Sequence, residues 1–205
     1  MSKEVRYLYE AFNLNIVSID LSLPSLFEKN DSIKDKVYIK EDKSCFWPTL
    51  VKSKFDNYYL KFSPNDFRLH VEGIGKFRVF NGEFIFWEKL NENVSNQDIT
   101  AFLLGSALGA LLIQRKILVF HGNALVKGNK AVVCIGHSGN GKSTMAFSLL
   151  RNGWKLIADD LVALSKDGYL LPGIPSIKLW ADAVKEFRLD INTLRPVRKG
   201  MKKYL

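Results

Sequence analysis

Residues 131–143 read AVVCIGHSGNGKS, five apolar residues followed by a glycine-rich loop that ends in Gly141-Lys142-Ser143. The loop matches the pattern G-x-x-x-x-G-K-[ST] at every fixed position. Such loops bind phosphate because glycines let backbone N–H groups approach the anion, and the helix that follows directs its positive end toward it. We therefore predict a strand over 131–135, a phosphate loop over 136–143 and a helix over 143–151.

The predicted phosphate site uses most of this loop. Lys142 supplies a mobile charge for the β- and γ-phosphates, and the Ser143 hydroxyl is a ligand for Mg²⁺. An ordinary glycine-rich turn between a strand and a helix is the structural alternative. Cys134, just before the loop, is interpreted as a small buried hydrophobic residue. The other residues expected to contact the nucleotide are Gly136, Ser138, Gly139, Asn140, Gly141 and Thr144.

Two adjacent acids follow the next predicted strand. The helix ends at Asn152-Gly153, Lys155–Ala158 forms a strand, and Asp159-Asp160 then stand 17 positions after Lys142. Strand, loop, helix and strand within about 30 residues predict a βαβ unit, whose carboxyl edge faces the ligand. One carboxylate there can hold Mg²⁺ while the other accepts a proton from an attacking hydroxyl. A role in a turn or cap is the alternative for such a pair.

The first hundred residues have strand character, because β-branched and aromatic residues alternate between turn residues. Asn81-Gly82 supplies the positive φ angles of a two-residue hairpin turn. The mixed-charge stretch 28–43 is interpreted as a surface connection, within which Val37–Lys40 is a candidate short strand. The other expected strands are Tyr58–Phe62, Phe67–Val71, Lys76–Phe80 and Glu83–Trp87.

The pattern changes to helix at Ser95, which forms a capping box with Asp98 ahead of the apolar residues 99–113. Gly105 and Gly109 within this helix are interpreted as allowing close packing of a neighbouring element. Short strands are then expected over 117–120 and 123–126. We place the domain boundary at this change, with a β-rich module over 1–94 and the phosphate-loop domain over 95–205.

Composition excludes several classes of protein. The 205 residues are 47% hydrophobic and 25% charged, unlike a disordered chain. The longest apolar run, 101–113, falls short of the roughly 20 residues of a membrane helix, so no membrane span is expected. Cys45 and Cys134 have no partners at metal-binding spacing, which favours a reduced, cytoplasmic setting.

The net charge is +9, which is compatible with a nucleotide, an acidic protein, nucleic acid or a membrane surface as partner. A nucleic-acid binder would rest on this charge alone, since no RNA-binding aromatic signature or helix-turn-helix pattern is present. The charge is concentrated in the last eighteen residues, in Arg188, Arg195, Arg198, Lys199, Lys202 and Lys203.

Several of these segments together resemble a known family. Phe120-His121-Gly122, the phosphate loop and Gly153–Asp160 resemble the catalytic domain of HPr kinase/phosphorylase and of HPr-kinase-like serine kinases, including those found with peptide-modification operons. Pro172–Pro175 with Lys178-Leu179-Trp180 adds a weaker match. The resemblance covers about 103–205 and implies an α/β fold with a P-loop βαβ core of the HPr kinase/phosphoenolpyruvate carboxykinase type, after a small β-rich N-terminal module.

The resemblance also implies roles for particular residues. His121 would lie near the transferred phosphate, Asp159 would be the base toward the substrate serine, and Asp160 would help to hold the metal. The implied cofactors are ATP and Mg²⁺, and the implied substrate is a protein or peptide that bears a serine. HPr kinases assemble into rings, so a homo-oligomer is among the implied partners.

The chain departs from the family pattern in three ways. Thr144 stands where HPr kinases usually have Glu, and the first hundred residues do not resemble the regulatory domain of true HPr kinases. Relatives continue beyond the point that corresponds to Leu205, so an incomplete catalytic domain is expected. The alternative function is therefore a nucleotide-binding regulatory or sensor module with little phosphotransfer. The choice among ATP, GTP and pyrophosphate as donor stays open.

Overall fold

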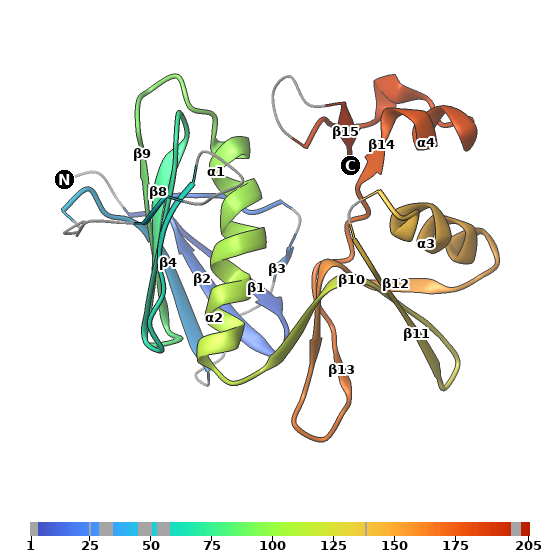
Figure 1. Ribbon diagram of the computed structural model, residues 1–205, viewed down its shortest axis with the longest axis horizontal. Coiled ribbons are helices and arrows are strands. Elements are labelled where there is room, and N and C mark those ends of the chain that lie inside the picture. Colours follow the sequence, from blue (N-terminus) through green and yellow to red (C-terminus); the bar gives the residue numbers. More distant parts are fainter. Residues whose placement is uncertain are drawn as a thin grey trace. The chain divides into compact units, whose positions relative to one another are not determined.

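The computed structural model describes residues 4–24, 26–28, 35–44, 51–52, 58–137, 139–197 and 202–205. The chain divides into two compact units, Met1–Ile117 and Leu118–Leu205, which are described separately (Figure 1). Both contain sheet and helix, so the prediction of a mixed α/β protein is confirmed. Among the residues named in the sequence analysis, Cys45, Ser138, Arg198 and Lys199 lie outside the described residues.

The N-terminal unit contains a nine-stranded sheet in the order β3-β1-β2-β4-β9-β8-β7-β6-β5. Strands β6 to β9 form an antiparallel meander that contains the strands expected between residues 58 and 87. The candidate strand at 37–40 is also confirmed, but it pairs in parallel with both β2 and β9. The strands are β1 (Arg6–Ala11), β2 (Leu14–Ile19), β3 (Phe27–Glu28), β4 (Lys36–Glu41), β5 (Val51–Lys52), β6 (Tyr58–Lys61), β7 (Asp66–Val71), β8 (Gly75–Phe80) and β9 (Phe84–Lys89).

The predicted hairpin joins β8 to β9. Asn81 and Gly82 have φ angles of 55° and 62°, as the dipeptide predicts. The pairing of Phe80 with Phe84 leaves three residues in the loop instead of the predicted two. The hairpin is therefore confirmed, with one extra residue, Glu83, before β9 begins.

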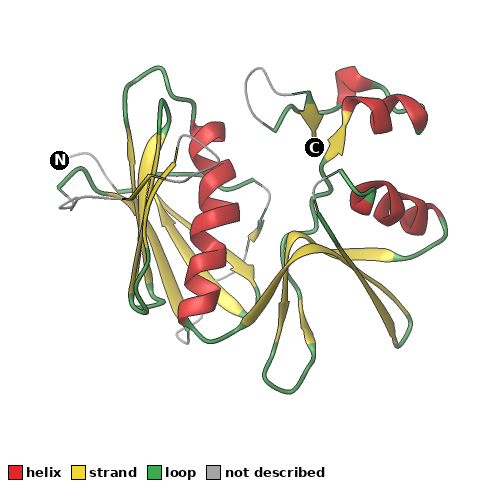
Figure 2. Ribbon diagram, viewed as in Figure 1, coloured by secondary structure: helices red, strands yellow, loops and turns green. Residues whose placement is uncertain are grey.

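A helix over residues 96–114 packs on this sheet and belongs to the same unit (Figure 2). It comprises α1 (Asn96–Phe102), a π-helical segment (Leu103–Ala107) and α2 (Leu108–Gln114). Ser95 caps it by accepting a hydrogen bond from the Asp98 N–H at 3.1 Å, so the N-cap of the predicted capping box is confirmed. At the other end, Gln114 and Arg115 bond the backbone of Gly82 in the hairpin. The compact units consequently divide at 117/118, whereas the sequence pattern places the boundary at 94/95.

The interpretation of Gly105 as a close-packing position is wrong. No heavy atom lies within 4 Å of the position that a Cβ would take on Gly105. The residue lies instead within the π-helical segment, where the regular i to i−4 hydrogen bonding is interrupted. An alanine fits here without displacing a neighbour.

The same helix is long and apolar enough to cross a membrane when judged by length and composition alone. Its 19 residues extend beyond the apolar run 101–113 and contain a window with a mean hydropathy of 1.3. In the structure, 44% of that window is buried. Leu103, Leu108, Leu111 and Leu112 are completely buried, as in the core helix of a folded unit.

The C-terminal unit contains a four-stranded sheet in the order β11-β10-β12-β13, in which all neighbours are antiparallel. Strands β11 and β12 are therefore parallel to each other, with β10 between them. The two short strands expected over 117–126 form one continuous strand, β10. The elements are β10 (Leu118–Lys127), β11 (Lys130–Ile135), α3 (Lys142–Arg151), β12 (Lys155–Leu164), β13 (Leu170–Leu171), β14 (Leu179–Trp180), α4 (Ala181–Glu186), a 3₁₀ turn (Ile191–Thr193) and β15 (Lys203–Tyr204).

Two small apolar clusters hold this unit together. Ala124, Ala158 and Val162 form the first, between β10 and β12. The second joins β14 and α4 to α3, because Leu179, Ala183 and Val184 pack against Phe147 of α3. The position of α4 beside α3 follows from this second cluster. Although β11 is apolar in sequence, it is the edge strand of the sheet, and Ile135 at its end is 57% exposed. Cys134, which the sequence analysis interprets as a small buried hydrophobic residue, is likewise only partly buried.

Candidate functional site

The glycine-rich loop joins β11 to α3, as the sequence predicts. Gly139 and Gly141 have φ angles of 86° and 73°, in the left-handed region that favours glycine. Gly141 is the N-cap of α3, and no side chain caps this end of the helix. The first backbone N–H groups of α3 are thus free of intrahelical partners, and the first turn carries no acidic side chain. This helix end has the electrostatic character that attracts an anion.

Lys142 folds back over the loop that precedes it. Its Nζ donates to the carbonyl oxygens of Gly136 and His137, both at 2.8 Å. Ser143 and Thr144 lie on the first turn of α3 and line a pocket together with Lys142, Gly139 and Gly141. Gly136 and Asn140 do not line the pocket, although both belong to the predicted contact set.

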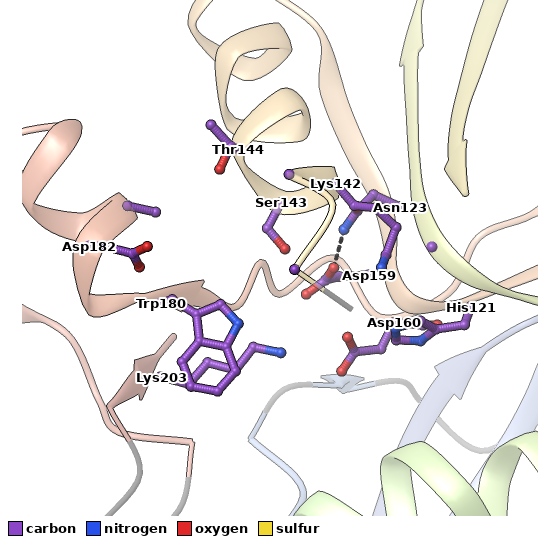
Figure 3. A pocket seen from close by; sticks show the side chains of 14 residues that line it. His121, Asn123, Lys142, Ser143, Thr144, Asp159, Asp160, Trp180, Asp182 and Lys203 are labelled. Carbon is purple, nitrogen blue, oxygen red and sulfur yellow. Dashed lines mark hydrogen bonds between the residues drawn. The ribbon is translucent and has the colours of Figure 1, made fainter. Parts of the chain in front are cut away.

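The two acids line the same pocket, and Asp159 lies next to Ser143 in Figure 3. Asp159 and Asp160 stand in the middle of β12, not at the end of a strand as predicted. Successive side chains of a regular strand point to opposite faces. Asp160 departs from that geometry with a φ angle of 63°, and both carboxylates line the pocket. A residue other than glycine in this conformation carries backbone strain of the kind that concentrates at functional sites.

Asp159 is the more buried acid, with 5% of its surface exposed. Its Oδ1 accepts a hydrogen bond from the Asn123 side chain, and its Oδ2 accepts one from the Lys178 backbone N–H at 2.9 Å. Burial, followed by the charge of Asp160, raises the pKa of Asp159 to about 7. A carboxyl group with such a pKa exchanges its proton near neutrality, as a general base must.

Asp160 has the opposite electrostatic character. Burial alone would raise its pKa, but the Lys178 ammonium, with smaller contributions from Lys203 and His121, brings the pKa below its usual value. The Nζ of Lys178 forms an ion pair with Oδ2 of Asp160. The Asp160 carbonyl oxygen accepts a hydrogen bond from His121 Nδ1 at 3.1 Å. Asp160 is thus the ionised member of the pair, and His121 keeps Nε2 for another partner.

The strand β10 brings the loop and the acids together. Gly122 pairs with Ile135 of β11 on one side and with Asp160 of β12 on the other. His121 and Asn123 flank it and line the pocket. A Cβ on Gly122 would collide with the backbone carbonyl of Cys134. The absence of a side chain at Gly122 therefore permits the close pairing of β10 and β11 beside the site.

We expect Gly122→Ala to destabilise the protein by about 1 to 3 kcal/mol, because the new methyl group meets rigid backbone instead of a movable side chain. Thermal unfolding followed by circular dichroism measures the effect. Gly105→Ala is the matched control, since its Cβ enters open space and alanine favours helix. A melting temperature of Gly122→Ala equal to that of the wild type would contradict the described pairing of β10 with β11.

Asn123, Lys178, Trp180 and Asp182 were not predicted as site residues. Asn123 is 1% exposed, and its position two residues after His121 places both on one face of a strand. Reading 117–126 as one strand would have revealed it. Lys178, which appears in the sequence analysis only within a weak motif match, contacts both acids through a loop 18 residues away. Of the basic residues near the C-terminus, Lys203 lines the pocket, whereas Arg195 and Lys202 do not.

The donor atoms of the pocket suit Mg²⁺. Among the described residues, no group of three or more His, Cys, Asp and Glu side chains could hold a metal ion by itself. Mg²⁺ in nucleotide sites needs fewer protein ligands, because one or two carboxylates hold it together with substrate phosphates and water. The Ser143 hydroxyl and the ionised Asp160 carboxylate are hard oxygen donors on one pocket, and they fit this pattern.

Comparison with known proteins gives one informative similarity. The chain is 32% identical over 168 residues to the HPr kinase/phosphorylase of Mycoplasmopsis pulmonis (strain UAB CTIP). The alignment covers 79% of this chain and 47% of that protein, so the chain spans about half the length of the curated relative it matches. No family model and no solved structure matches the chain. The similarity supports a distant relationship with HPr kinase/phosphorylase.

Proposed function

We propose that the protein transfers the terminal phosphoryl group of Mg²⁺-bound ATP to a serine hydroxyl of a protein or peptide. The observation that carries this proposal is the pocket itself, which is lined by Lys142, Ser143 and Asp159 together. The pocket thereby offers a positive charge, from Lys142, for a polyphosphate and a base, Asp159, for an attacking hydroxyl. The resemblance to HPr-kinase-like serine kinases supports serine as acceptor and the cytoplasm as location.

In this proposal the glycine-rich loop binds the donor. Backbone N–H groups at the start of α3 and the Lys142 ammonium contact its phosphates, and Lys142 exchanges its bonds to the loop carbonyls for bonds to phosphate oxygens. Ser143 and Asp160 hold Mg²⁺, which when bound neutralises phosphate charge. Asp160 is suited to this role because its pKa lies below the usual value.

Asp159 acts on the acceptor. The serine oxygen attacks the terminal phosphorus, its proton passes to the Asp159 carboxylate, and the bond to the leaving diphosphate oxygen breaks. Hydrogen bonds from Asn123 and the Lys178 N–H orient the Asp159 carboxylate. His121, held through Nδ1 by the Asp160 carbonyl, directs its remaining ring nitrogen to the transferred group. Catalysis here is mainly positioning and charge stabilisation.

The decisive experiment is a calorimetric titration of the purified chain with Mg-ATP, followed by transfer of labelled phosphate to candidate serine peptides. Saturable binding with label on serine supports the kinase. Binding without transfer to any peptide would support the nucleotide-binding regulatory module instead. Failure to bind Mg-ATP would contradict both functions.

The pH dependence of transfer provides a second test. Because the pKa of Asp159 is raised to about 7, the base is protonated below this pH and ionised above it. We expect kcat/KM for the acceptor to rise about tenfold for each pH unit below about 7 and to level off above it. Initial rates from about pH 5 to about pH 9 at saturating Mg-ATP measure this profile. A rate that is independent of pH over this range would contradict proton transfer to Asp159.

A further inference from the structure

One wall of the pocket has no part in the chemistry described above. It consists of Trp180 and Asp182, from the end of β14 and the start of α4, with Ala183 and Lys203. The Trp180 side chain lies at this wall with 45% of its surface exposed, although tryptophan is a large aromatic residue that proteins usually bury. The Nζ of Lys203 lies 5.6 Å from the centroid of its ring (Figure 3).

The Trp180 wall is held in a defined place. The residues on either side of it are buried against Phe147 of α3, namely Leu179, Ala183 and Val184. The ring centroids of Phe147 and Phe187 are 4.3 Å apart. Pairing of Trp180 with Lys203 joins β14 to β15. The residues that flank the exposed indole are therefore packed against α3, and the first turn of this helix carries Ser143 and Thr144.

The order of residues across the pocket sets the direction of a bound donor. The terminal phosphoryl group must lie near Asp159, since this base takes the proton of the attacking hydroxyl. In Figure 3, Ser143 lies between Asp160 with His121 on one side and Trp180 with Asp182 on the other. A donor whose terminal phosphate is near the acids and whose inner phosphates contact Ser143 extends toward Trp180. The acceptor enters on the side of the acids.

Lys203 lies close to both Trp180 and Asp160. Its ammonium interacts with the Trp180 ring and also lowers the pKa of Asp160. Its positive charge thus lies where a polyphosphate would pass between the acids and the indole. The arrangement of an aromatic face, a cation and a phosphate-binding helix end matches the base, the phosphate chain and the terminal phosphate of a nucleotide.

We propose that Trp180 is the stacking surface for the nucleobase of the donor. This inference rests on the proposed function, because it takes the direction of the donor from the role of Asp159. Stacking on an aromatic face accepts every base, since each base has a π-face. The site therefore distinguishes a nucleotide from a bare polyphosphate but tolerates both ATP and GTP.

Calorimetric titrations of the full chain with Mg-ATP, Mg-GTP and inorganic tripolyphosphate plus Mg²⁺ test the inference. We expect Trp180→Ala to weaken both nucleotides by about tenfold to a hundredfold, the usual effect of losing one base–aromatic stack. Binding of tripolyphosphate, which has no base, should not change. Trp180→Phe keeps an aromatic face and should retain most of the affinity for both nucleotides.

Tyr169→Ala is the matched control, because Tyr169 is 74% exposed and does not line the pocket. Unchanged nucleotide affinity in Trp180→Ala would overturn the inference, and so would an equal loss for tripolyphosphate. A raised KM for the acceptor peptide with unchanged nucleotide affinity would assign Trp180 to acceptor binding and overturn it as well. These results leave the proposed function standing, whereas a wild-type chain that binds none of the three probes would contradict the proposed function itself.

Discussion

Asp159→Asn is expected to abolish phosphoryl transfer while it leaves Mg-ATP binding within a few-fold of the wild type. The asparagine side chain has nearly the same shape but cannot accept the proton of an attacking hydroxyl. Loss of a general base lowers rates by about 10² to 10⁴. Steady-state kinetics with a labelled donor measure the rate, and calorimetry measures the affinity.

The structure also indicates that this variant folds. Oδ1 of Asn123 is buried and has no hydrogen-bond partner among the described residues. If the Asn123 amide turns over by 180°, this oxygen can accept from the new amide at 159, whose own oxygen accepts from the Lys178 N–H. The substitution also removes a buried carboxylate from beside Asp160, which relieves like-charge repulsion.

Asp167→Asn is the control for this substitution. Asp167 lies in the exposed turn between β12 and β13, outside the pocket, and its conversion should leave transfer unchanged. Transfer by Asp159→Asn at the wild-type rate would refute the assignment of the base. Loss of nucleotide affinity together with transfer would indicate instead that Asp159 supports the shape of the pocket.

Lys142→Ala is expected to weaken Mg-ATP binding by about tenfold to a hundredfold and to lower the transfer rate further. A hydrogen bond to a charged partner contributes about 1.5 to 3 kcal/mol, and Lys142 is the residue of the loop that can bring a full charge to the phosphates. The Lys142 side chain already lies over the loop, because its Nζ donates to the carbonyl oxygens of Gly136 and His137. Calorimetry and single-turnover transfer separate the two effects.

Two further variants show whether Lys142→Ala weakens Mg-ATP binding through the lost charge or through lost support of the loop. Lys142→Arg retains the charge, so it should recover part of the affinity if the interaction with phosphate dominates. Lys155→Ala removes an exposed lysine of β12 that lies outside the pocket and should bind Mg-ATP like the wild type. Wild-type affinity in Lys142→Ala would contradict phosphate binding by this loop.

Local features of the structure were largely predictable. The positive φ angles at Asn81 and Gly82, the cap of Ser95 with Asp98, and the start of α3 after Gly141 all appear where the sequence places them. Each depends on a few consecutive residues, whose steric limits and nearby hydrogen bonds act without the rest of the chain. The candidate site residues His121, Lys142, Asp159 and Asp160 were proposed from residue types and spacing that resemble a known family, and all four line one pocket.

The arrangement of strands was not predictable in the same way. Insertion of β10 between β11 and β12, and the parallel pairing of β4, depend on contacts between residues far apart in the chain. Strand periodicity indicates which face a residue occupies but says nothing of the neighbouring strand. For this reason the acids were expected at the end of a strand, whereas β12 continues past them to Leu164.

The sequence by itself determined the glycine-rich loop, the helix that follows it and the identity of the charged groups, because local backbone conformation and chemical type are properties of short segments. Only the tertiary structure decided the environment of those groups. The left-handed conformation of Asp160, the raised pKa of Asp159, the bridge from Lys178 and the exposed face of Trp180 each require elements brought together by folding. Burial and electric fields depend on everything within a few ångströms, and neighbours in space are set by packing and long-range strand pairing.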